Sequence, residues 1–270
     1  MIRVAQISDT HLSHRRAYAV PNVEAILRAI VADEPDFVVH TGDIAADDPD
    51  DAEERAFAFR MLSTGMPRPF AVVPGNHDTG GFSNDLWSRE RNDAFCATWG
   101  HDTFSVDLDS WRLVGANVYR LGDQEHDDWL AEQCATDRFV ALFVHQPMFL
   151  RAFEIDDDPD WSLDGERRRT LRRCLGRADV RLVASGHLHR YRALTPVHVF
   201  GPSAGFLGTP VADGSTQVVG YLSYSLHDDG AVTHRLAIPQ DVEQLWFSSF
   251  APHEAHLMRD APLNPVGAEP

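Results

Sequence analysis

Lysine is absent from this 270-residue sequence, so its 24 basic side chains are all arginines. They stand against 41 aspartates and glutamates, which gives a formal net charge of −17. Proteins that bind long DNA or RNA do so through basic surfaces that displace counterions from the phosphates. We therefore expect a small-molecule partner rather than long nucleic acid.

Cysteines and long apolar runs are also scarce. The three cysteines, Cys96, Cys134 and Cys174, are far apart and odd in number, which argues against a disulfide framework and fits a reducing compartment. No stretch approaches the roughly 20 apolar residues of a membrane span. Asp9 and His11 interrupt the N-terminal region before a signal-like apolar run develops. These features predict a cytoplasmic protein without a membrane span.

The sequence contains no internal repeat and no linker rich in proline, glycine or serine that would divide it. We expect one catalytic domain over residues 1–238. The segment 239–270 contains aromatic residues, and exposed aromatic side chains usually pack against another surface. We therefore expect a C-terminal extension that packs on the domain or on a partner subunit. The second of these alternatives would make the protein a homodimer or a higher homo-oligomer. The acidic segment 153–161 is either a solvated loop or a lid.

Short β-branched or aromatic runs alternate with segments of helical periodicity, which is typical of an α/β protein. The predicted buried strands are residues 2–8, 37–40, 70–73, 139–144 and 180–184. The predicted helices are residues 23–31, 52–62, 123–135 and 166–175. Two alternating stretches, 103–117 and 216–236, predict antiparallel strands or hairpins. The pattern predicts a layered α/β sandwich with mixed sheets.

Polar side chains that bind metals follow five of these strands, at the point where each strand ends. They are Asp9 and His11, Asp43, the Asn76-His77-Asp78 run, His145, and the pair His187 and His189. Taken singly, each group is more typical of a turn or a surface histidine. Ligands in open α/β sheets gather beyond the carboxyl ends of the strands, so the five groups together predict one metal site.

The proposed ligands mix oxygen and imidazole donors, which suits Fe, Mn, Zn or Co better than Ca or Mg. They are Asp9, His11, Asp43, Asn76, His145, His187 and His189. Seven side chains are too many for one such ion. Two divalent ions that share a carboxylate, roughly 3.5–4 Å apart, are the simplest solution.

The order D-x-H, G-D, G-N-H-D, H and G-H-x-H over about residues 1–200 resembles the calcineurin-like metallophosphoesterase family. The G-N-H-D form and the stretch 182–203 are most similar to the bacterial branch of class III cyclic-nucleotide phosphodiesterases and glycerophosphodiesterases. The resemblance implies a four-layer αββα sandwich of two mixed sheets. It also assigns Asp9, His11 and His189 to one metal and Asn76, His145 and His187 to the other, with Asp43 as the bridge.

In this chemistry two cations lower the pKa of a water toward about 7, and the resulting hydroxide attacks phosphorus. Asn76 and protonated His77 would stabilise the charge on the phosphate oxygens. The resemblance places His77 beside the phosphate as a non-ligand, and we assign it, as a hypothesis, to protonate the leaving oxygen. Asp78 is either a partner of His77, a helix cap or a solvated residue.

Recognition of the substrate is less defined. Arg15 and Arg190 flank the first and last ligand groups and could contact a phosphate oxygen, or could serve only surface solubility. Gln146 and Asn117 depart from residues common in the family, which affects the surroundings of the ligands rather than the ligands themselves. A site without an evident arginine clamp suits a monoanionic diester better than a dianionic monoester.

The leading hypothesis is therefore a phosphodiesterase for small organic diesters, such as cyclic nucleotides, glycerophosphodiesters or a lipid headgroup. A phosphomonoesterase or nucleotidase on the same site is the nearest alternative. A non-catalytic scaffold on the same fold is the alternative from another class, and the complete ligand set argues against it.

Overall fold

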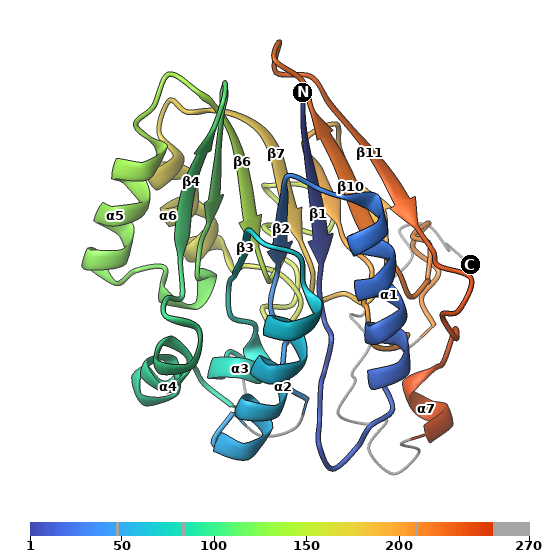
Figure 1. The fold of residues 1–270 in the computed structure, drawn as a ribbon. Helices are drawn as coiled ribbons and strands as arrows, with labels where there is room; N and C mark the ends of the chain where they lie inside the picture. The colour runs from blue at the N-terminus through green and yellow to red at the C-terminus, as the bar shows by residue number, and fades with distance from the viewer. Residues whose placement is uncertain (47–48, 83–84, 209, 251–270) are drawn as a thin grey trace, which may run out of the picture.

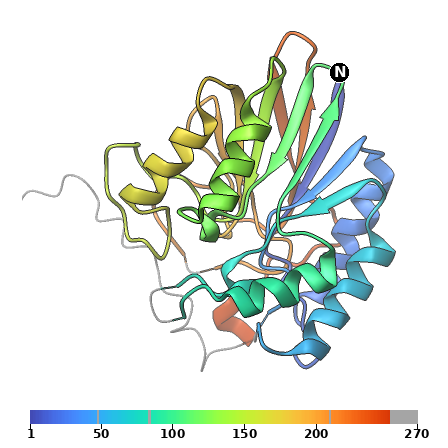
Figure 2. The same cartoon turned by 90° about the vertical axis from the view of Figure 1, so that its left-hand side faces the viewer.

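Two mixed β-sheets pack face to face, and helices cover both outer sides (Figure 1). The computed structural model describes residues 1–46, 49–82, 85–208 and 210–250. Figure 2, which views the molecule from the side of helix α5, shows the four layers as helices, sheet, sheet and helices. The predicted αββα sandwich is confirmed.

The first sheet has five strands in the order β11-β10-β1-β2-β3. Its parallel strands are β1 (Ile2–Ile7), β2 (Phe37–His40) and β3 (Phe70–Val72), and its antiparallel strands are β10 (Tyr221–Leu226) and β11 (Val232–Ala237). Every residue of β2 is buried, as expected for a strand covered on both faces.

The second sheet has six strands in the order β4-β5-β6-β7-β9-β8. They are β4 (Phe104–Leu108), β5 (Trp111–Gly115), β6 (Phe139–Val144), β7 (Asp179–Ser185), β8 (Arg192–Ala193) and β9 (His198–Phe200). Strands β5, β6, β7 and β9 are parallel, whereas β4 and β8 run antiparallel to their neighbours.

Helices α1 (Val20–Asp33), α2 (Ala52–Gly65) and α4 (Arg89–Trp99) pack on the first sheet, and α5 (Gln124–Cys134) and α6 (Gly165–Leu175) on the second. In the described part of the chain three short helices lie elsewhere: α3 (Asn76–Thr79), the 3-10 helix η1 (Val118–Arg120) and α7 (Phe247–Phe250). Aspartate or serine side chains cap the N-termini of α2, α4, α5 and α6.

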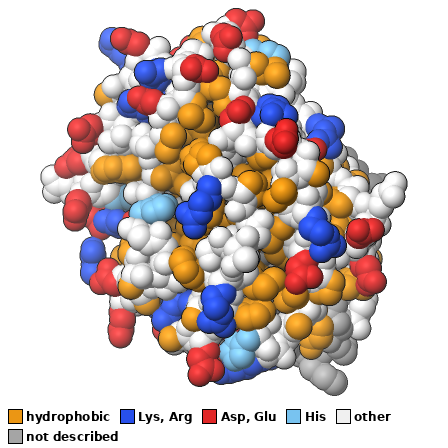
Figure 3. All heavy atoms as spheres, in the orientation of Figure 1, with side chains coloured by type: hydrophobic (Ala, Val, Ile, Leu, Met, Phe, Trp, Pro, Cys, Tyr) orange, Lys and Arg blue, Asp and Glu red, His pale blue; other side chains and the backbone are white. Residues whose placement is uncertain are grey.

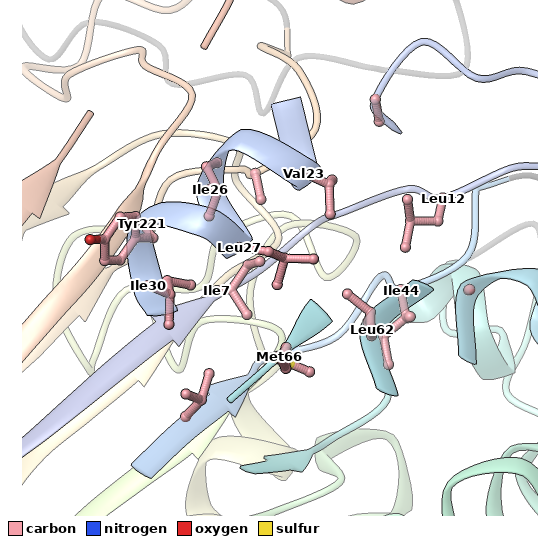
Figure 4. Close-up of a cluster of buried hydrophobic side chains, with 14 of the residues drawn as sticks. Ile7, Leu12, Val23, Ile26, Leu27, Ile30, Ile44, Leu62, Met66 and Tyr221 are labelled. Carbon is pink, nitrogen blue, oxygen red and sulfur yellow. The ribbon is translucent and has the colours of Figure 1, made fainter. Parts of the chain in front are cut away.

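Three large apolar clusters of described residues fill the spaces between the layers. One lies between the first sheet and its helices, and Figure 4 shows its side chains from α1, β1 and α2 packed together. A second lies between the two sheets and contains the fully buried Trp111 and Tyr224. The third lies between the second sheet and helices α5 and α6. This packing fixes both sheets in one rigid frame around the ends of their strands.

The C-terminal part of the described chain packs on the first apolar cluster. Val242, Trp246 and Phe247 are partly buried against it, and Trp246 forms a β-bridge with Leu207. The rest of the predicted extension, residues 251–270, lies outside the described residues. The predicted domain division stays a prediction.

Arginines are interspersed with carboxylates on the surface. On the face shown in Figure 3 the blue side chains, which are all arginines here, lie among red ones and form no continuous basic patch. Many make ion pairs, such as Arg91 with Asp50 and Asp85. Among the helices in the described ranges, none has the length and apolar character needed to span a membrane.

Candidate active site

The parallel strands of both sheets end on the same side of the sandwich, and the loops that follow them carry the predicted ligands. All seven side chains are at most 5% exposed: Asp9, His11, Asp43, Asn76, His145, His187 and His189. Backbone hydrogen bonds join the loops, for example from His11 N to Asp43 O at 3.1 Å and from Gly186 N to His145 O at 2.9 Å. The structure thus brings the seven predicted side chains to one place.

The backbone is unusual at five of these residues, which have positive φ without being glycine. They are Asp9 (52°), His11 (41°), Asp43 (53°), His187 (72°) and His189 (52°). Such conformations cost roughly 1–3 kcal/mol each and cluster at functional sites, where the surrounding structure holds them. The strain is consistent with loops selected for the direction of their side chains rather than for stability.

Two glycines allow these loops to approach each other closely. A Cβ on Gly75 would lie 2.1 Å from Asp43 Oδ1, and a Cβ on Gly186 would lie 1.8 Å from Ser8 Oγ and 2.7 Å from Asp9 Oδ2. Real Cβ atoms do not make contacts as short as these three. This explains the glycine that precedes Asn76 in one sequence motif and the glycine that precedes His187 in another.

One group of donors consists of Asp9, His11 and His189. The Nε2 atoms of His11 and His189 are 3.0 Å apart, and His189 Nε2 is 3.5 Å from Asp9 Oδ1. The donor atoms of these three residues all lie within 4.8 Å of one another, close enough to hold one ion.

A second group consists of Asp43, His145 and His187, with Asn76 beside it. His145 Nε2 is 3.2 Å from His187 Nδ1 and 3.1 Å from Asn76 Oδ1. Asp43 Oδ2 lies 3.3 Å from His145 Nε2 and 3.7 Å from His11 Nε2. The Asp43 carboxylate therefore reaches both groups, as a shared ligand must.

Backbone carbonyls orient three of the histidine rings. His145 Nδ1 donates to Thr41 O at 2.7 Å, His189 Nδ1 to Phe206 O at 3.0 Å, and His187 Nε2 to Asp160 O at 2.7 Å. The opposite nitrogen of each ring faces the other donors. Such outer hydrogen bonds fix the tautomer of metal-binding histidines.

Burial changes the charge of these groups. It lowers the pKa of His187 to about 3 and that of His189 to about 4, so both rings are neutral at pH 7 and present a lone pair. Burial also opposes a charge on His145, but Asp43 and Asp9 raise its pKa to about 9. Despite burial, the surrounding histidines hold the pKa of Asp43 well below its usual range, so it stays a carboxylate.

The donors fit divalent cations. Imidazoles and carboxylates in two groups, joined by one aspartate, are ligands that Fe, Mn, Zn and Co accept. The amide of Asn76 can also serve an anion, because its buried Nδ2 has no hydrogen-bond partner among the described residues. An unpaired buried donor costs about 1–3 kcal/mol, and it remains available for a bound anion.

His77 lies next to the donors and is half-buried. Its ring packs edge-on against His11 at 4.8 Å between centroids, its Nδ1 donates to Ala46 O at 2.8 Å, and its backbone N donates to Asp43 Oδ1 at 2.9 Å. Its donor atom also lies within 4.8 Å of those of His11 and Asp43. The ring of His77 is therefore placed beside the cluster, with its Nδ1 held by Ala46 O.

Asp78 is a buried cap rather than a solvated residue. Its carboxylate accepts hydrogen bonds from Gly75 N at 2.8 Å, from Ile44 N at 3.1 Å and from Ala45 N at 3.2 Å. Burial and the nearby charge of Asp43 raise its pKa to about 6. Asp78 thus joins the start of α3 to the loop after β2 and holds both in place, which corresponds to the helix-cap alternative.

The two predicted substrate arginines each have a carboxylate partner. Arg15 Nη2 is 2.7 Å from Asp51 Oδ2, and Arg190 Nε is 3.1 Å from Asp213 Oδ2. A paired guanidinium adds little net positive charge to a site. A role for either in binding phosphate stays a prediction.

Asn117, where the family more often has aspartate, belongs to a buried network. Its Nδ2 donates to Asn92 Oδ1 at 2.8 Å and to Asp102 Oδ2 at 3.1 Å, and its Oδ1 accepts from Tyr119 N at 3.1 Å. An aspartate here would face Asp102 with a like charge. The hydroxyl of Tyr119 then donates to Asn76 Oδ1 at 3.3 Å, so the network supports a predicted ligand.

Sequence reasoning missed the aromatic side chains beside the site, since no spacing marks them. Phe206 packs 5.0 Å from His11 and 5.1 Å from His189 between ring centroids. Phe82 and Trp161 lie near His187, at 5.9 Å and 5.6 Å between ring centroids. The only signal was the position of Trp161 at the end of the acidic segment 153–161.

Two curated proteins are similar to this chain in sequence. The chain is 33% identical over 135 residues to the serine/threonine-protein phosphatase CPPED1 of Pongo abelii, which covers 45% of this chain and 42% of that protein. It is 29% identical over 203 residues to the "Probable glycerophosphodiester phosphodiesterase GpdQ" of Arcobacter nitrofigilis, covering 69% of this chain and 71% of that protein. The chain thus spans less than half the length of the first of these relatives.

The fold is also shared with solved structures. The purple acid phosphatase PPD1 of yellow lupin superposes with a TM-score of 0.63 at 12% identity, covering 99% of this chain and 57% of that one. At that identity the likeness shows the fold alone. The sequence model of the calcineurin-like phosphoesterase family matches residues 2–191, which include all seven predicted ligands. The chain therefore belongs to the calcineurin-like phosphoesterase family, whose members are metal-dependent.

Proposed function

We propose that the protein is a phosphodiesterase that hydrolyses small organic phosphodiesters at a site for two divalent cations. The observation that carries the proposal is the position of Asp43, whose carboxylate lies within 3.7 Å of a histidine in each donor group. One buried carboxylate between two sets of imidazoles is the arrangement that a shared ligand requires.

In this proposal Asp9, His11 and His189 hold one cation, and Asn76, His145 and His187 hold the other. Cations bound there would stabilise the phosphate oxygens as Lewis acids. They would also lower the pKa of a water, so that hydroxide is available to attack phosphorus at neutral pH. The chain itself supplies the rigid placement of the donors, through the strained loops and the carbonyl contacts of the histidines.

His77 and Asn76 are the proposed polar contacts to the reacting phosphate. The free amide hydrogens of Asn76 Nδ2 can donate to an oxygen that gains charge in the transition state. The Nδ1 atom of His77 donates to Ala46 O, so the ring is held with its Nε2 as the edge left for the substrate. A proton on Nε2 can pass to the departing oxygen.

The charge of the site favours a diester. A monoester carries two negative charges and is usually held by arginines in a bidentate contact, whereas Arg15 and Arg190 already pair with Asp51 and Asp213. The name of the GpdQ relative agrees with a diester. The name of the CPPED1 relative favours the alternative, a phosphomonoesterase on the same site.

Hydrolysis of bis(p-nitrophenyl) phosphate and of p-nitrophenyl phosphate separates the two. With Mn or Co added, we expect kcat/KM to be at least about tenfold higher for the diester, a difference of about 1.4 kcal/mol. The release of p-nitrophenol reports both reactions in one assay. A tenfold preference for the monoester would establish the alternative function.

Other parts of the interpretation stay predictions. They are the identity of the two ions among Fe, Mn, Zn and Co, the cytoplasmic location, a homodimer or higher homo-oligomer, and cyclic nucleotides, glycerophosphodiesters or a lipid headgroup as the natural substrate. A screen of the metal-reconstituted protein against cyclic AMP and glycerophosphocholine addresses the last of these.

A further inference from the structure

Two aromatic side chains from distant parts of the chain meet beside the proposed active site. The rings of Phe82 and Trp161 are 6.3 Å apart between centroids at an interplanar angle of 68°. Phe82 lies 6.0 Å from His77 and 5.9 Å from His187, and Trp161 lies 5.6 Å from His187. We call Phe82 and Trp161 the aromatic wall. Both are only partly buried, so ring surface is left for a ligand.

The loop that carries Trp161 is held firmly against the sandwich. Pro159 O accepts from Gln146 Nε2 at 2.7 Å, and Asp160 O accepts from His187 Nε2 at 2.7 Å. Trp161 itself packs against the apolar cluster of Leu150, Leu188 and Phe200. The ring is thus fixed in place before any substrate binds, which lowers the entropy lost on binding.

Phe82 is positioned by the turn after α3. Gly80 has φ of 79°, and a Cβ on Gly81 would lie 2.4 Å from the ring of Tyr119, so only glycine allows the chain to pass there. Gly81 N then donates to Asp85 O at 2.7 Å, and Phe82 forms a β-bridge with Asp85. The turn therefore directs Phe82 back toward His77.

The acidic loop beside the wall carries five carboxylates: Glu154, Asp156, Asp157, Asp158 and Asp160. Asp156 pairs with Arg168 and Asp157 pairs with Arg151, whereas Glu154 and Asp158 are exposed to solvent, which screens their charge. A cationic ester group, such as a quaternary ammonium, gains most where unpaired negative charge surrounds the aromatic rings. A neutral ring instead gains from stacking on one face and meeting the edge of the other ring, which the 68° angle permits.

We propose that the aromatic wall binds a neutral aromatic ring, either aryl or nucleobase-like, on one ester arm of the substrate. This inference rests on the proposed function and adds a substrate class to it. Phe82 borders His77, the proposed donor to the leaving oxygen, so a substrate bound at the phosphate site has one ester arm within reach of the wall.

The test compares diphenyl phosphate and diethyl phosphate as competitive inhibitors of bis(p-nitrophenyl) phosphate hydrolysis. For the wild-type holoenzyme we expect the inhibition constant of diphenyl phosphate to be about tenfold lower, as one well-formed ring contact provides. Phe82→Ala and Trp161→Ala should reduce the ratio to below about threefold, and Trp161→Phe should keep it. Diethyl phosphate should inhibit all of them equally, which shows an intact phosphate site.

Phe59→Ala is the matched control, because Phe59 is another partly exposed phenylalanine, on α2, and packs on Trp99. It should leave the ratio unchanged. Any one of three results would overturn the proposal. They are equal inhibition of the wild type by both diesters, an unchanged ratio in both alanine variants, and tighter inhibition by a choline diester than by diphenyl phosphate.

Failure of the proposed function is seen separately, as a wild-type preference for the monoester. In that case the aromatic wall is tested with monoesters. Phenyl phosphate and ethyl phosphate are compared as competitive inhibitors of p-nitrophenyl phosphate hydrolysis, and the ratio of their inhibition constants is measured in the same variants.

Discussion

Asp43→Asn is expected to lower kcat/KM for bis(p-nitrophenyl) phosphate by at least about 10³-fold, or about 4 kcal/mol. The substitution keeps the shape of the side chain and removes the negative charge that lies between His11 and His145. Without it the site loses the charge that offsets two cations. The bound metal should fall below about one ion per chain, measured by elemental analysis of the desalted protein.

Asp109→Asn is the control for this variant. Asp109 is an exposed aspartate that also has positive φ, 47° against 53° for Asp43, so both substitutions place asparagine in the same backbone region. We expect wild-type activity and metal content from Asp109→Asn. An Asp43→Asn protein that kept two ions and more than about a tenth of its activity would show that Asp43 is not the shared ligand.

His77→Ala is expected to act mainly on substrates whose leaving group needs a proton. Activity on methyl phenyl phosphate should fall about 10²-fold, and activity on methyl p-nitrophenyl phosphate by less than about threefold, because p-nitrophenolate departs without help. The ratio of the two losses is the measurement. It isolates proton transfer from binding, since the two substrates share the methyl arm and the phosphate.

His14→Ala is the matched control, since His14 is an exposed histidine that lies 3.7 Å from Glu53. It should change neither rate. Equal losses on both substrates in His77→Ala, with metal content unchanged, would assign His77 to phosphate binding and remove its role as the acid.

The strands that carry the site were predictable because each contains a short apolar run that is largely buried. Residues 37–40 and 139–144 coincide with β2 and β6 as observed. The polar groups after the strands then converge because the parallel strands end on one side of both sheets. The apolar pattern of the strands and the topology of parallel sheets together therefore predict that Asp9, Asp43 and His187 lie in one site.

Other elements gave no such signal. Helix α4 buries mainly Asn92 and Phe95, so its apolar periodicity is weak. Strands β8 and β9 have two and three residues and exist only through their pairing. Tertiary contacts define elements of this kind, and local sequence does not.

The surroundings of the site were equally out of reach of the sequence. The approach of Phe82 to Trp161 depends on two loops that meet only in the folded chain. The alternatives for Asp78 were separated only by its three backbone donors, Gly75, Ile44 and Ala45. The positions of polar residues after the strands predict which ligands converge. The roles of the neighbouring residues depend on hydrogen bonds between loops, which the sequence does not show.

Metal content is the most direct test of the central claim that one site binds two cations. The purified protein is reconstituted with Mn, Fe, Zn or Co, desalted and analysed for bound metal. We expect about two ions per chain. A single ion would contradict the two-ion assignment, and a protein that retained none would contradict the hydrolytic proposal and favour a non-catalytic scaffold.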